Sequence, residues 1–562
     1  MSYCLESKAS DCRNCYKCIR YCPMKAISFA NNKAAIIHDE CILCGRCYLM
    51  CPQNSKIVRN DVSKVQKIIH SKRKVIVSLA PSFVANFNAN FVDVKEAILK
   101  LGFSDVEETA IGATIVKKRY DEMLDEKHDV IISSCCHSIN LLIQKHYPKA
   151  LPFLADVYSP MVAHGKDIKS RYGADVAVVF VGPCIAKKDE GERNGDYVDA
   201  VLTFSELEEW LKEEKIVIEC NTSLHRDEES KARLFPICGG ILETMKKENE
   251  NYHYVAVDGV EHAKKVLQDI IDGKIHKCFI EMSACHGSCV NGPMMKNNKN
   301  SLVSRYINVE NIAGKKDFTI GKLNSQEIAH PYYAISLATL ATPSEKEITK
   351  VLRTMGKMAK SDELNCGSCG YTSCREKATA VIQGRATIEM CLPYLMEKAQ
   401  SFSEKIVMNS PNGLMVLDES LNIQLLNNSM CKIIGIPAPS VLIKKSVTTI
   451  LDPTDYALAL GDNSDRTIAK KVYLSEYEKY VENTIIYDRK FHILICVMKD
   501  ITDRELQAQK RDELIKKSVE ITNKVIEKNM RSVQEIASLL GESTAETKVA
   551  LLSLKDALNN DK

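Results

Sequence analysis

The sequence predicts a multidomain protein with an α/β domain at its centre, small cysteine-rich modules on either side of it, then an α+β domain and C-terminal helices. Its length of 562 residues exceeds the size at which one hydrophobic core keeps growing. Between residues 72 and 340, short runs rich in Val and Ile (75–79, 130–132 and 176–181) are typical of buried parallel strands joined by helices. The 23 cysteines fall mostly into tight groups, which predicts separate small modules.

The charge balance argues against two classes of partner. With 76 basic and 73 acidic side chains and no Lys/Arg block, we expect neither a nucleic-acid nor a membrane-surface partner. No apolar run approaches the ~20 residues that span a bilayer, and the N-terminus is charged rather than apolar. We therefore expect a cytoplasmic protein, in which thiols stay reduced and grouped cysteines act as metal ligands.

Residues 1–60 contain the pattern C-x2-C-x2-C-x3-C-P twice. This repeat resembles the bacterial ferredoxin-like module with two 4Fe-4S clusters, in which the fourth cysteine of each run ligates the other cluster. The resemblance assigns one cluster to Cys12, Cys15, Cys18 and Cys51, and the other to Cys22, Cys41, Cys44 and Cys47. The alternative is a pair of structural zinc knuckles, against which the proline after both runs argues.

Three motifs in the domain at 72–340 each follow an apolar strand, where open α/β sheets bind their ligands. They read S-S-C-C-H at 133–137, G-P-C-I-A-K-K-D-E at 182–190 and E-M-S-A-C-H-G-S-C at 281–289. Together and in this order they resemble the signature segments of FeFe (iron-only) hydrogenases, T-S-C-C-P, M-P-C-x-x-K-x-x-E and E-x-M-A-C-x-G-G-C. We therefore expect the three motifs to converge in space.

The hydrogenase resemblance implies an H-cluster, which joins a 4Fe-4S cubane to a two-iron subcluster with CO and CN ligands. Its cubane ligands would be Cys136, Cys184, Cys285 and Cys289, and Cys289 would also bridge to the two-iron subcluster. Lys187 would contact a cyanide ligand, and Cys135 would relay protons. The alternative for Cys135 alone is a small buried apolar residue.

Departures from the family pattern point to altered chemistry. Gly182 and Ser283 stand where the family has methionines packed on the two-iron subcluster, which should open space and change its hydrogen bonding. Ala155 replaces a serine of the proton route, although Ser159 is retained. The segment 114–120, T-I-V-K-K-R-Y, replaces the glutamates of proton exit, and cations do not readily accept protons. This pattern resembles the sensory branch of the family.

A second cysteine group lies in the predicted small domain at 343–400. Cys366, Cys369, Cys374 and Cys391 have the spacing C-x2-C-x4-C-x16-C, which resembles small 4Fe-4S domains of corrinoid and electron-transport proteins. Zinc is the alternative for four thiolates. With the H-cluster cubane, the chain would hold four 4Fe-4S clusters.

Residues 402–505 resemble a PAS domain, through N-S-P-N-G-L-M-V-L-D at 409–418 and D-I-T-D-R-E at 500–505. Such domains sense ligands or dimerise. His492 could ligate a haem, but a lone histidine on a strand is more often an ordinary packed residue. Cys431 and Cys496 are expected in the core.

Two helices are expected in residues 506–562. The first carries an apolar face that includes Leu506, Leu514 and Val525, and a capping box at Ser543 and Glu546 would begin the second, about Thr544 to Asn559. We expect a homodimer through the PAS domain and the first helix. No kinase, cyclase or DNA-binding pattern follows the PAS domain, so the second helix would dock a downstream signalling protein, in the resembling family a serine/threonine phosphatase.

The favoured interpretation is a sensory FeFe hydrogenase of low turnover that relays hydrogen or redox state through 4Fe-4S clusters to the PAS domain. The alternatives are a fully competent hydrogenase linked to ferredoxin or another redox partner, and an iron-sulfur protein without the two-iron subcluster.

Overall fold

The computed structural model describes residues 3–71, 73–126, 128–219, 224, 226–246, 251–295, 301–321, 323–337, 342–461, 468–540 and 551–557. The chain divides into two compact units, Met1–Tyr394 and Leu395–Lys562. Within the described parts, none of the helices combines the length and apolarity needed to cross a lipid bilayer.

The N-terminal module, residues 3–60, is built from two small antiparallel sheets and two short helices. Strand β1 (Leu5–Ser7) pairs with β4 (Lys56–Val58), and β2 (Ile27–Ala30) pairs with β3 (Lys33–Ile36). Helices α1 (Lys17–Tyr21) and α2 (Arg46–Leu49) each carry the third cysteine of one repeat and contact each other. The internal repeat of the sequence is thus also a structural repeat.

The α/β domain contains two parallel sheets, as the apolar runs predict. The first has the order β6 (Asp105–Glu108), β5 (Val75–Leu79), β8 (Ala177–Gly182), β9 (Ala200–Thr203). The second has the order β10 (His253–Asp258), β11 (Cys278–Ser283), β7 (Val130–Ile132). Every residue of β5, β7, β8 and β11 is buried, so these strands need apolar side chains on both faces.

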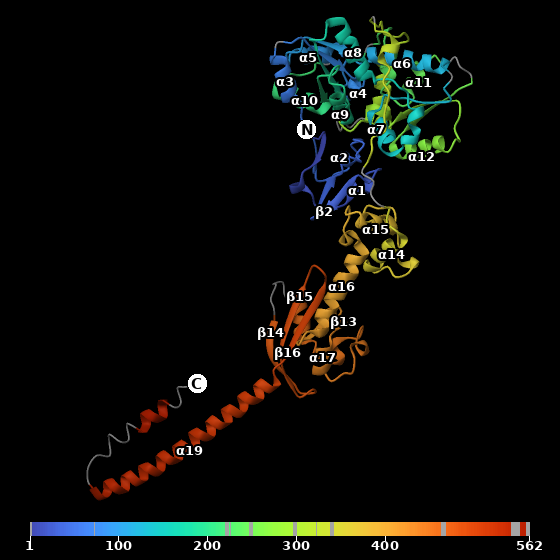
Figure 1. Ribbon diagram of the computed structural model, residues 1–562. Coiled ribbons are helices and arrows are strands. Elements are labelled where there is room, and N and C mark those ends of the chain that lie inside the picture. The colour runs from blue at the N-terminus through green and yellow to red at the C-terminus, as the bar shows by residue number, and fades with distance from the viewer. Residues whose placement is uncertain are drawn as a thin grey trace. The chain divides into compact units, whose positions relative to one another are not determined.

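Helices surround these sheets (Figure 1). They are α3 (Val62–His70), α4 (Phe83–Phe87), α5 (Phe91–Leu99), α6 (Ala110–Asp125), α7 (His137–His146), α8 (Pro160–Tyr172), α9 (Ala186–Arg193), α10 (Phe204–Glu213), α11 (Gly240–Thr244), α12 (Val260–Ile271) and α13 (Leu302–Ile312). Short 3-10 turns are Ala9–Asp11, Pro148–Phe153, Lys231–Leu234, Ser288–Asn291, Ser325–Ile328, Lys360–Asp362, Ile388–Met390, Pro439–Val441 and Val447–Thr449.

Buried Lys188 donates to Asp61 (2.7 Å) and Glu206 (2.8 Å), and these two contacts hold α9 to the start of α3 and to α10.

A small helical domain ends the first unit. It contains α14 (Glu345–Thr354), α15 (Cys374–Ile382) and the beginning of α16 (Leu392–Asn409). Ser344 and Glu347 form a capping box that starts α14. The N-terminal module holds this domain through polar contacts, since Lys25 Nζ donates to the Gly370 carbonyl (2.8 Å) and Phe29 N to the Arg385 carbonyl (2.7 Å).

The second unit holds a five-stranded antiparallel sheet with the order β13 (Ile423–Leu426), β12 (Gly413–Asp418), β16 (Ile493–Asp500), β15 (Lys479–Asp488), β14 (Ile468–Leu474). Helices α17 (Asn428–Ile433) and α18 (Thr454–Gly461) accompany it. Cys431 and Cys496 are buried in its core, as expected. The expectation of a packed residue at His492 is wrong, because this exposed side chain lies in the turn before β16 and pairs with Glu419.

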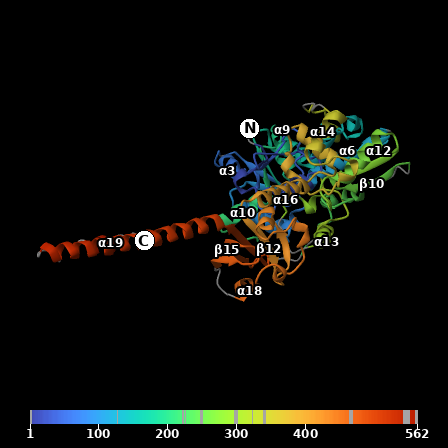
Figure 2. The same cartoon turned by 90° about the horizontal axis from the view of Figure 1, so that it is seen from below.

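The first C-terminal helix is observed as α19 (Thr502–Leu540), a continuous helix of 39 residues (Figure 2). Leu514, Ile521 and Val525 on it are each more than half exposed, so the apolar side chains predicted there are not covered within the described residues. The capping box at Ser543 and the beginning of the second helix lie outside the described residues. Residues 551–557 are helical.

Gly45 allows the N-terminal module to pack closely on the α/β domain. Its φ is +73°, and a Cβ there would lie 2.5 Å from Pro293 Cβ and 3.1 Å from Ile185 Cδ1. A residue with a side chain would therefore meet both a conformational cost and a steric clash.

We expect Gly45→Ala to destabilise the first unit by roughly 1–3 kcal/mol more than Gly273→Ala, because only the former overpacks an interface. Gly273 is a matched control, since its φ is +67° and no heavy atom would lie within 4 Å of a Cβ. Anaerobic denaturant titration, followed by iron-sulfur absorbance, measures the difference. Equal losses in both variants would show that the close contact at Gly45 contributes nothing.

Candidate active site and metal centres

The three motifs converge at the C-terminal ends of β7, β8 and β11. Ser133, directly after β7, accepts a hydrogen bond at its Oγ from Met282 N of β11 (3.1 Å). Pro183 follows β8, and its carbonyl accepts from Met294 N (3.0 Å), which belongs to the segment after the third motif. The carboxyl ends of β7 and β11 meet in one sheet, and the carboxyl end of β8 meets them from the other sheet, so three distant segments supply one site.

This convergence brings Cys136, Cys184, Cys285 and Cys289 together. Burial, followed by repulsion from Cys136, raises the pKa of Cys184 to about 11. Burial and then Cys136 raise the pKa of Cys289 to about 12. Burial and the other three thiols raise the pKa of Cys285 well above its usual value. Four thiols this close together ionise as a set only around a cationic centre, and the iron of a 4Fe-4S cubane fits as that centre.

A cavity of about 90 Å³ lies beside this cysteine set. Cys135, Cys184, Lys187 and Cys289 line it together with apolar residues such as Met161 and Phe235. Ser82, which lies in none of the sequence motifs, also lines the cavity, and its buried Oγ has no hydrogen-bond partner among the described residues. The sequence signal for Ser82 is its place in A-P-S, directly after buried strand β5. A free donor and a cation at an apolar cavity suit a compact ligand with negatively polarised ends, as the cyanides of a two-iron subcluster are.

Lys187 is held at the cavity by two contacts. Its Nζ donates to the Cys135 carbonyl (3.1 Å) and pairs with the Glu190 carboxylate. Burial disfavours the Lys187 cation, but the Glu190 carboxylate outweighs burial and holds the lysine pKa above its ordinary value. The site therefore contains a fixed positive charge.

Cys135 contacts a hydrogen-bond chain that ends inside the protein. Its Sγ is 3.3 Å from the hydroxyl of Tyr120, a fully buried residue of α6. The Tyr120 oxygen accepts from Ser134 N (2.9 Å) and lies 3.2 Å from Ser134 Oγ. Ser134 Oγ donates to the Val157 carbonyl (2.6 Å). The Tyr332 hydroxyl donates to the same carbonyl (3.0 Å). A backbone carbonyl cannot pass a proton onward, so among the described residues the hydrogen bond that Ser134 donates ends there.

Gly182 and Ser283, the two positions where the family has methionine, differ in their surroundings. The expectation that Gly182 opens space is wrong, because the ring of Phe180 fills it and a Cβ at Gly182 would lie 2.6 Å from Phe180 Cε1. Phe180 also lines the cavity. The Ser283 hydroxyl donates to the Cys285 carbonyl (3.3 Å), so it bonds to the backbone of its own motif.

In the N-terminal module, Cys22, Cys41, Cys44 and Cys47 line one small pocket. This set contains the fourth cysteine of the first repeat, as an exchange of ligands between the runs requires. Cys12 and Cys15 add to the burial that raises the pKa of Cys18, which places these three thiols near one another. Cys51 Sγ accepts a hydrogen bond from Ser55 N (3.3 Å).

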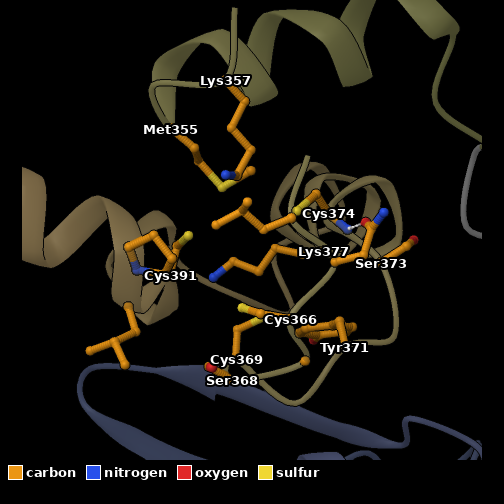
Figure 3. Close-up of a pocket in the computed structure, with 15 residues that line it drawn as sticks. Met355, Lys357, Cys366, Ser368, Cys369, Tyr371, Ser373, Cys374, Lys377 and Cys391 are labelled. Carbon is orange, nitrogen blue, oxygen red and sulfur yellow. Dashed lines mark hydrogen bonds between the residues drawn. The ribbon is translucent and has the colours of Figure 1, made fainter. Parts of the chain in front are cut away.

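The third cysteine group also lines one pocket, shown in Figure 3. Cys366, Cys369, Cys374 and Cys391 surround it, and the Lys377 side chain extends into the space between them (Figure 3). Lys377 is only 1% exposed, and its Nζ donates to the Thr387 carbonyl (2.6 Å). A buried ammonium is costly without an anionic neighbour, and a cluster held by four thiolates is such a neighbour.

Neighbouring cysteine groups lie close to one another. The charge of Cys44 contributes to the raised pKa of Cys285, so the second repeat adjoins the cubane site. Burial, with Cys369 and more weakly Cys22, raises the pKa of Tyr371 to about 12. Tyr371 therefore lies between the third group and the N-terminal module.

Family comparisons match all three cysteine-bearing regions. Residues 73–293 match the family described as iron only hydrogenase large subunit, C-terminal domain. This region of the chain is iron-only hydrogenase-like. Residues 4–69 match a 4Fe-4S dicluster domain, and residues 362–393 match a putative Fe-S cluster family. These matches favour iron over zinc in the N-terminal module and in the third group.

Two curated relatives are similar to this hydrogenase-like chain. Iron hydrogenase 1 of Clostridium pasteurianum is 27% identical over 302 residues, which cover 42% of this chain and 52% of the relative. The periplasmic Fe hydrogenase large subunit of Nitratidesulfovibrio vulgaris is 28% identical over 254 residues, which cover 35% of this chain and 60% of the relative. The chain thus spans about half to three fifths of the length of these relatives. Since one of them is periplasmic by name, the cytoplasmic location stays a prediction.

Solved structures are similar to separate parts of the chain. An FeFe-hydrogenase from Chlamydomonas reinhardtii is 16% identical, with a TM-score of 0.37, over 48% of this chain and 92% of that one. The PAS domain of an HTR-like protein from Haloarcula marismortui is 20% identical, with a TM-score of 0.17, over 19% of this chain and 97% of that one. Neither likeness carries an argument about function, and the PAS assignment stays a prediction.

We expect Lys377→Met to lower the reduction potential of the third cluster, because reduction adds negative charge that the buried cation stabilises. At a fixed potential the ratio of reduced to oxidised cluster should fall about tenfold, which corresponds to about 59 mV for one electron. Redox titration monitored by electron paramagnetic resonance measures this ratio.

The control for this prediction is Lys350→Met, which removes an exposed lysine from α14. Iron content should be the same in both variants and the wild type. An unchanged potential in Lys377→Met would mean that the ammonium does not act on the cluster, and a redox-silent third site would mean that it holds zinc.

Proposed function

We propose that this chain is a sensory FeFe hydrogenase that binds hydrogen, or oxidises and evolves it slowly, at an H-cluster. The cluster, when bound, supplies the interconversion of hydrogen with protons and electrons. One observation carries the proposal: the cysteine set and the cavity are intact, while the hydrogen bonds of the adjoining thiol Cys135 end at the Val157 carbonyl.

Ala155 and Tyr120 lack the acid-base groups that a proton route would need there, although Ser159 is retained. Ala155 is 1% exposed and packs in the same apolar cluster as Tyr120, so it offers no hydroxyl beside the chain. Burial raises the pKa of Tyr120 well above its usual value, and the tyrosine therefore does not ionise. General acid-base groups contribute about 10²–10⁴-fold to a rate, and their loss fits a slow enzyme.

The segment that replaces the exit glutamates is occupied by paired cations. Lys117 Nζ pairs with Asp317 (2.6 Å) and Arg119 with Glu126 (2.5 Å). Both cations are almost fully buried on α6. Each already holds its protons and a carboxylate partner, so neither accepts a proton from the site.

An electron route supports the signalling part of the proposal. The third group adjoins the N-terminal module at Tyr371, and the second repeat adjoins the cubane site at Cys44. Electrons would enter or leave through these clusters, with ferredoxin or another redox partner. The PAS domain and α19 would then pass the redox state to a separate signalling protein, for which a serine/threonine phosphatase is the candidate.

Two other functions account for part of these observations. A fully competent hydrogenase would have the same clusters, but it would need a proton route other than the one through Ser134. An iron-sulfur protein without the two-iron subcluster would have no use for Cys135 and Lys187 at the cavity or for the unpartnered hydroxyl of Ser82.

We expect turnover at least about 100-fold below that of a bulk hydrogen producer assayed in parallel, because acid-base relay is missing. After maturation, infrared bands of metal-bound carbonyl and cyanide should be present and should shift under hydrogen. Ala155→Ser should leave turnover slow, since Ser134 still ends its chain at Val157. Turnover equal to the bulk producer would refute the sensory proposal, and absent infrared bands would favour the protein without the subcluster.

Deleting residues 506–562 should leave the clusters and the infrared bands unchanged while lowering the oligomer mass, because α19 exposes apolar side chains that a second copy would cover. Light scattering measures the mass, and pull-down with the signalling partner measures docking. A truncated protein that stays dimeric and still binds its partner would reassign the helices to packing within their own chain.

A further inference from the structure

A cluster of two histidines and one carboxylate lies on the surface beside the third motif. Asp258 ends β10, His262 is in the first turn of α12, and His286 directly follows Cys285. One ligand atom from each side chain lies within 4.8 Å of the other two. The two histidines are exposed, so solvent ions reach them.

His262 presents a free ring nitrogen. Its Nδ1 lies 2.9 Å from the Asp258 carbonyl oxygen, and because a carbonyl only accepts, Nδ1 carries the proton. In the neutral imidazole, Nε2 then carries the lone pair that can bind a metal ion. Metal-binding histidines usually donate their other ring N–H to a carbonyl or carboxylate in this way.

His286 and Asp258 are also oriented by the backbone. His286 packs directly on Gly259, where φ is +85° and a Cβ would lie 2.7 Å from His286 Nδ1. Gly287 N donates to Asp258 Oδ2 (2.7 Å), which leaves Oδ1 at 3.6 Å from His286 Nδ1. Two ligands at 2.0–2.1 Å from a tetrahedral zinc ion lie about 3.4 Å apart, so this spacing suits a shared ion.

We propose that Asp258, His262 and His286 form a surface site for one divalent transition-metal ion such as Zn²⁺. Two imidazoles and a carboxylate are ligands that zinc prefers, and three protein ligands leave an open position for water or another ligand. The ion would join the end of β10, the start of α12 and the loop of Cys285. This site is separate from the four-thiolate sets and does not depend on hydrogen turnover.

Zinc titration of the full-length protein tests the site, with its clusters reconstituted anaerobically so that the thiolates are occupied. Calorimetry should show one bound Zn²⁺, and His262→Ala and His286→Ala should each weaken it at least tenfold, or about 1.4 kcal/mol. The matched control is His276→Ala, an exposed histidine whose Nδ1 pairs with Asp129 alone (2.8 Å), and it should bind as the wild type does.

X-ray absorption at the zinc edge gives a second, independent readout. Nitrogen and oxygen ligands near 2.0–2.1 Å would support the site, whereas a sulfur shell near 2.3 Å would overturn it by placing the ion on thiolates. Wild-type affinity and stoichiometry in both His262→Ala and His286→Ala would also overturn it. Iron content and iron-sulfur absorbance, unchanged across the variants, show that each protein is folded and loaded.

Discussion

The electrostatic cost of burying several thiols at one place dominates this structure. Strands β7 and β11 of one sheet and β8 of the other end near one another, and their loops place Cys136, Cys184, Cys285 and Cys289 where burial and neighbouring thiols raise the pKa of the last three. A metal centre offsets this cost and allows the thiols to ionise as ligands. The packing of the domain and the binding of iron therefore depend on each other.

Close packing between modules follows from the same requirement. Gly45 lies against the side chains of Pro293 and Ile185, so the second repeat packs directly on the segments of the second and third motifs. On the other side, Tyr371 is buried between the N-terminal module and the third group. Contacts that stabilise the fold are thus also the contacts across which electrons would pass.

The hydrogen bonds around the site do not connect it to its surroundings in the way that the adjoining cysteine groups do. The cavity beside the cubane site has a thiol, a cation and the Ser82 hydroxyl, and within the described residues the hydrogen bonds from the thiol through Tyr120 and Ser134 lead to the Val157 carbonyl. Paired cations on α6 occupy the next segment. A site with connected cysteine groups and an isolated proton chain is suited to report its state more than to turn over quickly, which is why a sensory role is the favoured proposal.

The sequence by itself determined the features that depend on local pattern. Cysteine spacing predicted the three cysteine-bearing regions that the family comparisons match. Continuous apolar runs predicted β5 and β7 with the bounds that the structure has, because a strand buried on both faces needs such a run. Which side chains surround the site, and which partners they reach, could be read only from the folded structure. Phe180 fills the space at Gly182, Tyr120 rather than a carboxylate meets Cys135, and Ser82 keeps an unpartnered hydroxyl at the cavity. Most of these contacts join residues far apart in the chain, and which side chain fills a space or reaches a partner depends on packing that no local pattern encodes.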